Sequence, residues 1–223
     1  MIELEDVAMS YGGGELLAEM TLKLVPGSFH FLTGPSGAGK TTFMKLCYGE
    51  LMPTAGRVTL FGADARAMGR DDLALLRRRV GVVHQDCQFL DHLSLAENIA
   101  LPLAVAGQSV NAGELKQLLG WVGLSARADA LPPELSGGER QRAALARAVI
   151  QSPDVIIADE PTGNLDWEMS LRLLTLLIEL NKMGKTVMIA THDLTLIRSV
   201  KAQVQARVLR IQNRRLHLAG ADL

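Results

Sequence analysis

A glycine-rich segment that ends in a lysine and a threonine, Gly34–Thr41, has the residue types that bind phosphate. Its spacing is G-x-x-x-x-G-K-T, and it joins a short apolar run, residues 29–33, to a helical pattern. The backbone N–H groups of such a loop point at an anion, and the positive end of the next helix strengthens the attraction. Lys40 is expected to reach the β- and γ-phosphates of a nucleotide, and the Thr41 hydroxyl to ligate Mg²⁺. The residues predicted to bind the nucleotide here are Gly34, Pro35, Ser36, Gly37, Ala38, Gly39, Lys40, Thr41 and Thr42.

Two adjacent carboxylates follow an apolar run that begins at Asp154. A buried strand would place Asp159 at the edge of a sheet beside the phosphate loop, where it could hold Mg²⁺ through water. Glu160 would then be the general base that polarises the attacking water. The alternative is a capped turn after a strand, which the presence of the phosphate loop makes the less favoured interpretation.

Gln85 and His192 each follow a run that is typical of a buried strand. Ligand-facing residues collect at the carboxyl ends of strands in open α/β sheets. Gln85 could therefore contact Mg²⁺ and the attacking water, and His192 could lie within reach of a γ-phosphate. Spacing alone is weak support for Gln85, and a single histidine is more often structural.

A serine, two glycines and a glutamate, Ser136–Glu139, open a second helical pattern. Ser136 and Glu139 form a capping box, while Gly137 and Gly138 weaken the first turn and leave its N–H groups bare. Such a helix end is an anion site separate from the phosphate loop. A chain with one complete phosphate loop and one spare anion site predicts that two chains share nucleotides.

The elements that must position these residues alternate between strands and helices. Strands are expected at 2–9, 16–24, 29–33, 57–61, 80–84, 154–159 and 185–190, with a hairpin over 206–218. Helices are expected at 71–79, from Ser94 with a break at Pro102, from Asn111, over 136–150, and over 167–181 after an N-cap at Asp166. Residues 87–150 are richer in helical patterns than the rest. We therefore expect one domain, in which 87–150 is a helical subdomain inserted between 1–86 and 151–223.

Composition excludes several other classes of protein. The chain has 223 residues, 48% of them hydrophobic, and a net charge of −1, which argues against a binder of nucleic acid that relies on bulk charge. Its two cysteines have no metal-binding or redox spacing. No apolar stretch has the length of a signal peptide or a membrane span. We therefore expect a cytoplasmic protein that reaches a membrane only through a partner. The run Arg77–Arg79 is expected to be a solvated helix end rather than an anion site.

Together these motifs resemble the ATP-binding-cassette (ABC) ATPases over essentially the whole chain. The matching segments are Gly34–Thr42 (Walker A), Gln85 (Q-loop), Leu135–Gln141 (signature), Val155–Glu160 (Walker B), Asn164–Asp166 (D-loop) and His192 (switch histidine). The resemblance implies an α/β fold: a RecA-like P-loop NTPase core with a small antiparallel β-part and an α-helical subdomain. It implies hydrolysis of ATP with Mg²⁺ in a head-to-tail homodimer. Ser136, Gly137 and Gly138 of one subunit would contact the γ-phosphate held by the other.

The same resemblance assigns two further nucleotide-site residues. Tyr11 lies in a glycine-rich stretch where the residues alone favour a tyrosine that simply ends a strand. In the ABC family an aromatic at this position stacks on adenine, which favours that role for Tyr11. Asp166 belongs to the D-loop beside the shared nucleotide.

Within the family, Asp159–Asp166 resembles a group that includes the cell-division ATPases of the FtsE type and the LolD and MacB-type ATPases. The segments most similar to the FtsE type are Phe31–Lys40, Leu76–Gly81, Gln85–Asp86 and Ala190–Asp193. That implies an FtsX-like integral membrane partner, a peripheral place on the cytoplasmic side of a bacterial inner membrane, and control of cell-wall hydrolases. The partner is expected near Phe89–Leu103. The alternatives are an ATPase of lipoprotein-releasing (LolD) or MacB-type export systems, and a scaffold that binds ATP with little hydrolysis. A DNA-repair cassette would need a long coiled coil, for which there is no pattern.

Overall fold

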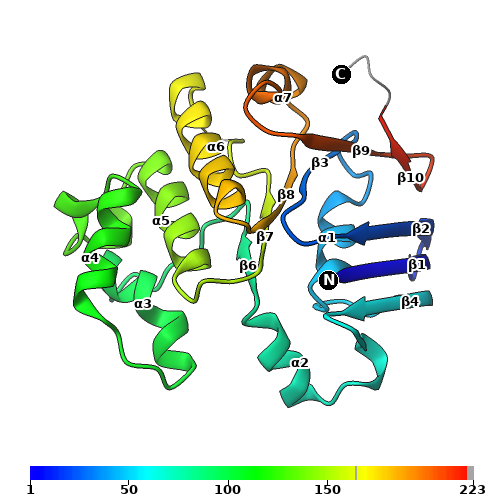
Figure 1. Ribbon diagram of the computed structural model, residues 1–223, viewed down its shortest axis with the longest axis horizontal. Coiled ribbons are helices and arrows are strands. Elements are labelled where there is room, and N and C mark those ends of the chain that lie inside the picture. Colours follow the sequence, from blue (N-terminus) through cyan, green and yellow to red (C-terminus); the bar gives the residue numbers. More distant parts are fainter. Residues whose placement is uncertain (164, 220–223) are drawn as a thin grey trace.

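The chain, for which we describe a computed structural model, forms two β-sheets with helices around the larger one (Figure 1). The structure describes residues 1–163 and 165–219. The strands are β1 Ile2–Tyr11, β2 Gly14–Leu24, β3 Phe29–Thr33, β4 Ala55–Leu60, β5 Ala63–Asp64, β6 Val80–Val83, β7 Val155–Asp159, β8 Thr186–Ala190, β9 Ala206–Gln212 and β10 Arg215–Leu218. The α-helices are α1 Lys40–Cys47, α2 Arg70–Arg77, α3 Leu95–Val105, α4 Ala112–Trp121, α5 Gly137–Val149, α6 Trp167–Lys182 and α7 Leu194–Val200. Short 3₁₀ helices cover Ala65–Ala67, Ser125–Arg127 and Pro132–Glu134.

The larger sheet has six strands in the order β10-β9-β3-β8-β7-β6. All neighbouring pairs are parallel except β9 and β10, which form the expected C-terminal hairpin. Every residue of β3, β7 and β8 is buried, because a parallel sheet is covered on both faces. Their carboxyl ends lie at one edge of the sheet, and the phosphate loop, the paired carboxylates and His192 follow them directly.

The smaller sheet is antiparallel, with the order β2-β1-β4-β5, and it packs with α1 against one face of the larger sheet. Figure 1 shows α1 beside β1 and β2. Leu17 from β2, Leu32 from β3 and Phe43 from α1 share one buried cluster there. The β-part therefore holds the helix that follows the phosphate loop.

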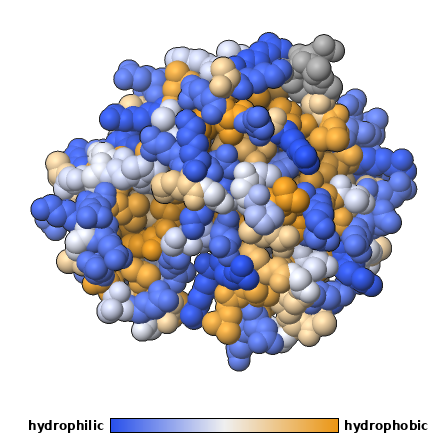
Figure 2. Space-filling model, viewed as in Figure 1, coloured by the Kyte–Doolittle hydropathy of each residue, from blue (hydrophilic) through white to orange (hydrophobic). Residues whose placement is uncertain are grey.

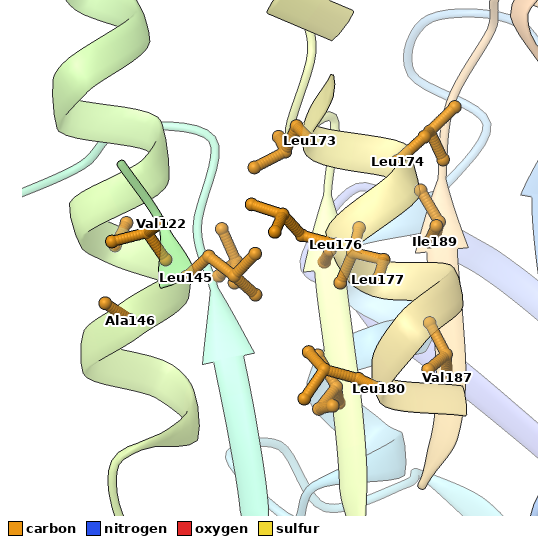
Figure 3. Packing of buried hydrophobic residues seen from close by; sticks show 14 of the residues in the cluster. Val122, Leu145, Ala146, Leu173, Leu174, Leu176, Leu177, Leu180, Val187 and Ile189 are labelled. Atoms are coloured by element: carbon orange, nitrogen blue, oxygen red, sulfur yellow. The ribbon is translucent and has the colours of Figure 1, made fainter. Parts of the chain in front are cut away.

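On the opposite face, α5 and α6 both pack on the sheet, α5 against β6 and α6 against β8. Figure 3 shows Leu173 and Leu176 of α6 on the side toward Leu145 of α5, and Leu177 and Leu180 over the strands. The apolar positions of α6 recur at helical spacing, which is why the sequence predicts this helix closely. The same cluster extends into α3 and α4, so the helical region shares a core with the sheet.

Both predicted capping boxes are present, at Ser94 for α3 and at Ser136 for α5. The break predicted at Pro102 is wrong, because α3 continues through it to Val105. Proline removes one N–H donor, but here only three residues of the helix follow it. The carbonyl of Pro102 accepts hydrogen bonds from Ala106 N at 3.1 Å and from Gln151 Nε2 at 2.9 Å, so the last turn is held from outside the helix.

Strand β6 approaches α5 without any side chain between the two backbones at Gly81. A Cβ at this position would lie 2.3 Å from the carbonyl oxygen of Ala148. Only glycine permits this approach, since backbone atoms of a helix cannot move aside as the end of a side chain can. The strand that leads to Gln85 is therefore fixed directly to the helix that begins at Gly137.

The arginine run that ends α2 is used in structural contacts. The Arg77 guanidinium donates to the carbonyl of Gly49. Arg79 forms an ion pair with Asp154 at 2.7 Å, and its guanidinium carbon lies 3.8 Å from the ring centroid of Phe61. These contacts join α2 to neighbouring segments, and residues 77–79 remain exposed, as expected of a solvated helix end.

The surface mixes polar and apolar areas. Figure 2 shows apolar side chains reaching this face in several separate areas, one of them over the helical region. Among the described residues, no helix combines the length and the apolar character needed to cross a membrane.

Replacing buried His30 on β3 with leucine is expected to reduce the loss of folding stability as the pH falls from 6.5 to 4. Desolvation, and secondarily the charge of Arg207, lower the pKa of His30 to about 4. As the pH falls, His30 therefore binds a proton near pH 6.5 in the unfolded chain but only near pH 4 in the folded chain. The free energy of unfolding should fall between pH 6.5 and 4 by up to about 3 kcal/mol.

Urea unfolding at pH 7.5, 5.5 and 4.5 measures this effect. His30→Leu should gain stability relative to the natural chain as the pH falls, whereas the exposed control His217→Gln should not. Parallel profiles for His30→Leu and the natural chain would show that another group governs acid sensitivity.

Candidate functional site

A cavity of about 710 Å³ opens at the carboxyl ends of the central strands. It brings together residues that lie far apart in the sequence, from the phosphate loop to the segment after β8. Its lining residues are Leu16, Pro35, Ser36, Gly37, Gly39, Lys40, Thr41, Thr42, Gln85, Asp159, Glu160, Gly163 and His192. The phosphate-loop, Gln85, carboxylate and histidine predictions thus meet in one place.

The phosphate loop passes closely under strand β2. Gly39 has φ = +94°, and a Cβ there would lie 2.8 Å from a methyl carbon of Leu17. The loop must therefore have glycine at this point, immediately before α1 begins at Lys40. The first-turn N–H groups of α1 have no acceptor within the helix and can serve an anion in the cavity.

The Lys40 ammonium lies inside this loop. Its Nζ donates to the carbonyl of Gly34 at 3.0 Å and lies 3.6 Å from Glu160 Oε1. Both side chains are largely buried, so their attraction is screened less than it would be at the surface. Lys40 thus sits between the loop carbonyls and the carboxylate, at the place where phosphate charge would be held.

Thr41 and Asp159 form a pair suited to a hard cation. Thr41 Oγ1 donates to Asp159 Oδ2 at 2.6 Å, while the buried Oδ1 of Asp159 has no hydrogen-bond partner among residues 1–163 and 165–219. A hydroxyl and an orphaned carboxylate oxygen are ligands that Mg²⁺ accepts. Mg²⁺ usually takes one or two protein oxygens and completes its shell with water and phosphate. The residues present therefore fit Mg²⁺ bound together with a nucleotide.

Glu160 and His192 both line the cavity and are in contact with each other. Nδ1 of His192 lies 3.1 Å from both Oε1 and Oε2 of Glu160. Glu160 also has φ = +44°, a left-handed conformation that is uncommon for a non-glycine residue and often marks a functional site. The histidine is 71% exposed, so it fixes the carboxylate from the open side of the cavity.

The predicted second anion site lies outside this cavity. Ser136 caps α5, and Gly137 lines a separate hollow of about 380 Å³ with Gln85 and Arg140. Glu139 Oε2 accepts from the Ser136 amide at 2.8 Å. That bond, helped by an ion pair with Arg127, lowers the pKa of Glu139 to about 2.

Several predicted nucleotide-site residues do not line the cavity. Tyr11 ends β1 with 49% of its surface exposed. Asp166 accepts a hydrogen bond from Met169 N at 2.8 Å and caps α6, as predicted. Gly34 and Ala38 belong to the phosphate loop but do not line the cavity. Asn164 lies outside the described residues. A nucleotide role for Tyr11 and Asp166 remains a prediction.

The structure gives contacts to two residues for which the sequence predicted no role of their own. Leu16 lines the cavity from β2, but an apolar residue in a strand carries no functional signal. Gln141 is buried in α5, and its Nε2 donates to the carbonyl of Gln85 at 3.3 Å. Gln141 lies one helical turn before Leu145, on the apolar face of the expected helix, and a polar residue at such a position could have indicated a specific buried contact.

Comparison with known proteins places the chain. A model of the ABC transporter family matches residues 17–163. The chain is 42% identical over 201 residues to the cell division ATP-binding protein FtsE of Haemophilus influenzae, covering 88% of this chain and 92% of that protein. It is 40% identical to the FtsE of Escherichia coli over 220 residues, 97% of each chain. A dimeric structure of the ATP-binding cassette MJ0796 in a post-hydrolysis state with ADP and Pi has a TM-score of 0.86 and 30% identity, covering 99% of this chain and all of that one.

The chain therefore belongs to the ABC transporter family of ATPases, as both the phosphate-loop fold and the cavity indicate. Within that family it groups with the cell division ATP-binding proteins FtsE. Its activity is the binding and hydrolysis of ATP.

Proposed function

We propose that two copies of this chain enclose ATP head to tail, with the phosphate loop of one facing the start of α5 of the other. The observation that carries this proposal is the separation of the two anion sites: Ser136–Gly138 does not line the cavity that holds Lys40. A second chain would bring the missing donors to the γ-phosphate. The dimeric MJ0796 cassette supports the arrangement.

In this proposal the reaction takes place at the Glu160 carboxylate. Water attacks the γ-phosphorus while the bond from that phosphorus to the β–γ bridging oxygen breaks, and ADP leaves with the bonding electrons. Glu160 accepts the proton of the water, and His192 keeps the carboxylate oriented through its 3.1 Å contacts. Lys40 and the loop amides hold the phosphates, and Gln85 lies at the cavity edge beside the water. Mg²⁺, held by Thr41 and Asp159, would neutralise phosphate charge.

Removing the Thr41 hydroxyl is expected to weaken the response to Mg²⁺. Thr41→Val keeps the shape but deletes the oxygen that pairs with Asp159, so the Mg²⁺ concentration for half-maximal ATPase activity should rise about tenfold. Thr41→Ser keeps the oxygen and should remain close to the natural chain. A Mg²⁺ titration at saturating ATP measures this, and an unchanged midpoint for Thr41→Val would remove Thr41 from the metal site.

We further propose that the dimer works at the inner face of a bacterial membrane with an FtsX-like integral partner. The FtsE relatives support this role. In the proposed complex, closure of the dimer on ATP is passed through the partner to enzymes that cut the cell wall. The helical region 87–150 is the subdomain that receives it.

The segment between β6 and α3 has the properties of a rigid contact surface. Arg147 donates to the carbonyl of Gln88 at 2.6 Å, and its guanidinium carbon lies 4.5 Å from the ring centroid of Phe89. Asn98 donates to the carbonyl of Leu90 at 3.0 Å and accepts from its amide at 2.8 Å. Leu90 itself is 41% exposed. An apolar side chain is thus presented on a loop held from both sides.

Co-purification from membranes, with ATPase activity measured with and without the captured partner, tests the proposal. Leu90→Asp should lose the FtsX-like partner and keep the basal ATPase rate, whereas Leu75→Asp, an exposed leucine on α2, should keep both. Retention of the partner by Leu90→Asp would place the contact elsewhere. Capture of a large export permease instead would favour the transporter alternative.

A further inference from the structure

The N–H groups at the start of α5, which would receive a phosphate, lie close to the carboxylate of Glu139. The first-turn N–H groups of a helix lack intrahelical acceptors, which leaves those of Gly137 and Gly138 for a ligand. Glu139, in the same turn, holds its carboxylate 2.8 Å from the Ser136 amide. The capping box strengthens the helix, but its carboxylate would repel the γ-phosphate that the proposed dimer brings to this end.

Arg127 is positioned to cancel that repulsion. Its Nε lies 2.9 Å from Glu139 Oε1, on the side of the carboxylate away from the Ser136 bond. The segment carrying Arg127 is fixed to the start of α3, because Ala96 N donates to Ala128 O and Leu95 N donates to Ala130 O, both at 2.9 Å. The guanidinium is therefore delivered to Glu139 by a braced backbone.

The exposure of the pair shows which role fits it. Arg127 is 49% and Glu139 17% exposed, and ion pairs open to water contribute little to stability. The pair also leaves the capping bonds of Ser136 intact, since those are made by the other carboxylate oxygen and by the serine hydroxyl. The main effect of the Arg127–Glu139 ion pair is therefore on the electrostatic potential at the start of α5.

We propose that Arg127 is a positioning residue that neutralises Glu139 and so keeps the start of α5 receptive to the γ-phosphate bound by a second copy of the chain. The inference rests on the proposed shared site. It assigns to Arg127 a part in ATP-driven dimerisation without contact with the nucleotide.

The test measures the ATP concentration for half-maximal dimerisation, by size-exclusion chromatography, in a Glu160→Gln background that does not consume ATP. Arg127→Ala should raise that concentration about five- to tenfold at low salt, and less at 0.5 M salt because of screening. With Glu139→Gln also present, which keeps the capping bond but not the charge, Arg127→Ala should change it less than about twofold. Binding of fluorescent mant-ATP to monomers should be unaffected.

Lys23→Ala, which removes a comparable surface pair with Glu3 at 2.7 Å, is the matched control and should behave as the parent. An equal defect of Arg127→Ala with and without Glu139→Gln would overturn the inference, since it would show a structural role. No defect in either background would overturn it too. If the Glu160→Gln parent itself failed to dimerise with ATP, the shared site would be wrong as well.

Discussion

Replacing Glu160 with glutamine is expected to slow ATP hydrolysis by about 10³-fold, the range typical of a lost general base. Glutamine has the same size and can still accept a hydrogen bond from His192, but it cannot take the proton of the attacking water. ATP would still bind through Lys40 and the loop amides. The variant should therefore accumulate as an ATP-bound dimer.

Release of phosphate measures the rate, and size-exclusion chromatography with ATP measures the dimer. Glu179→Gln is a matched control, because it makes the same change in a carboxylate that accepts from Trp121 Nε1 at 2.8 Å, outside the cavity. The control should keep the natural rate. A natural rate in Glu160→Gln would remove Glu160 from the role of base.

Mixing two inactive variants is expected to restore ATPase activity. Lys40→Ala deletes the phosphate-binding ammonium. Gly138→Asp places a carboxylate at the start of α5, where a Cβ would meet only the side chains of Leu165 and Met169 at 3.7 Å, so the fold should tolerate it. Each variant alone has both shared sites damaged. A mixed dimer has one site with an intact loop and an intact helix end.

For random pairing, half of the dimers are mixed and half of their sites are intact, which predicts up to about a quarter of the natural activity. The control places both substitutions in one chain and mixes it with an equal amount of the natural chain. Those mixed dimers have no intact site, so only pairs of natural chains remain active, and the added variant should lower the activity of the natural chain to about half of what it shows alone. Recovery in the first mixture beyond either variant alone supports sharing. If the first mixture stays inactive while each variant still dimerises, Ser136–Gly138 does not complete the site of a second chain.

The parts of the fold that were predictable are those whose causes lie within a few residues. The phosphate loop, both capping boxes and the Asp166 cap depend on local hydrogen bonds, so residue type and spacing indicate them. The ends of parallel strands also meet at one edge of a sheet. That rule is what predicted the meeting of Asp159, Glu160 and His192.

What the sequence could not indicate depends on contacts between distant segments. The break predicted at Pro102 failed because the last turn of α3 is held by Gln151, 49 residues later. Leu16 became part of the cavity because β2 passes over Gly39. The pairing of Arg127 with Glu139 likewise joins a 3₁₀ helix to α5, and no pattern in either segment specifies it.

The glycine at position 81 sets a condition on building hybrid proteins from this chain. Its strand and the helix carrying Ala148 touch through their backbones, so the spacing between them is inherited as a unit. A helical region transplanted from another cassette would pack on this core only if the helix that replaces α5 ran at the same distance from β6. Conversely, a donor whose partner strand carries a side chain at this point would bring a helix set too far out, and Gln85 and the α5 end would no longer be in register. Exchange of modules should therefore take β6 and α5 together.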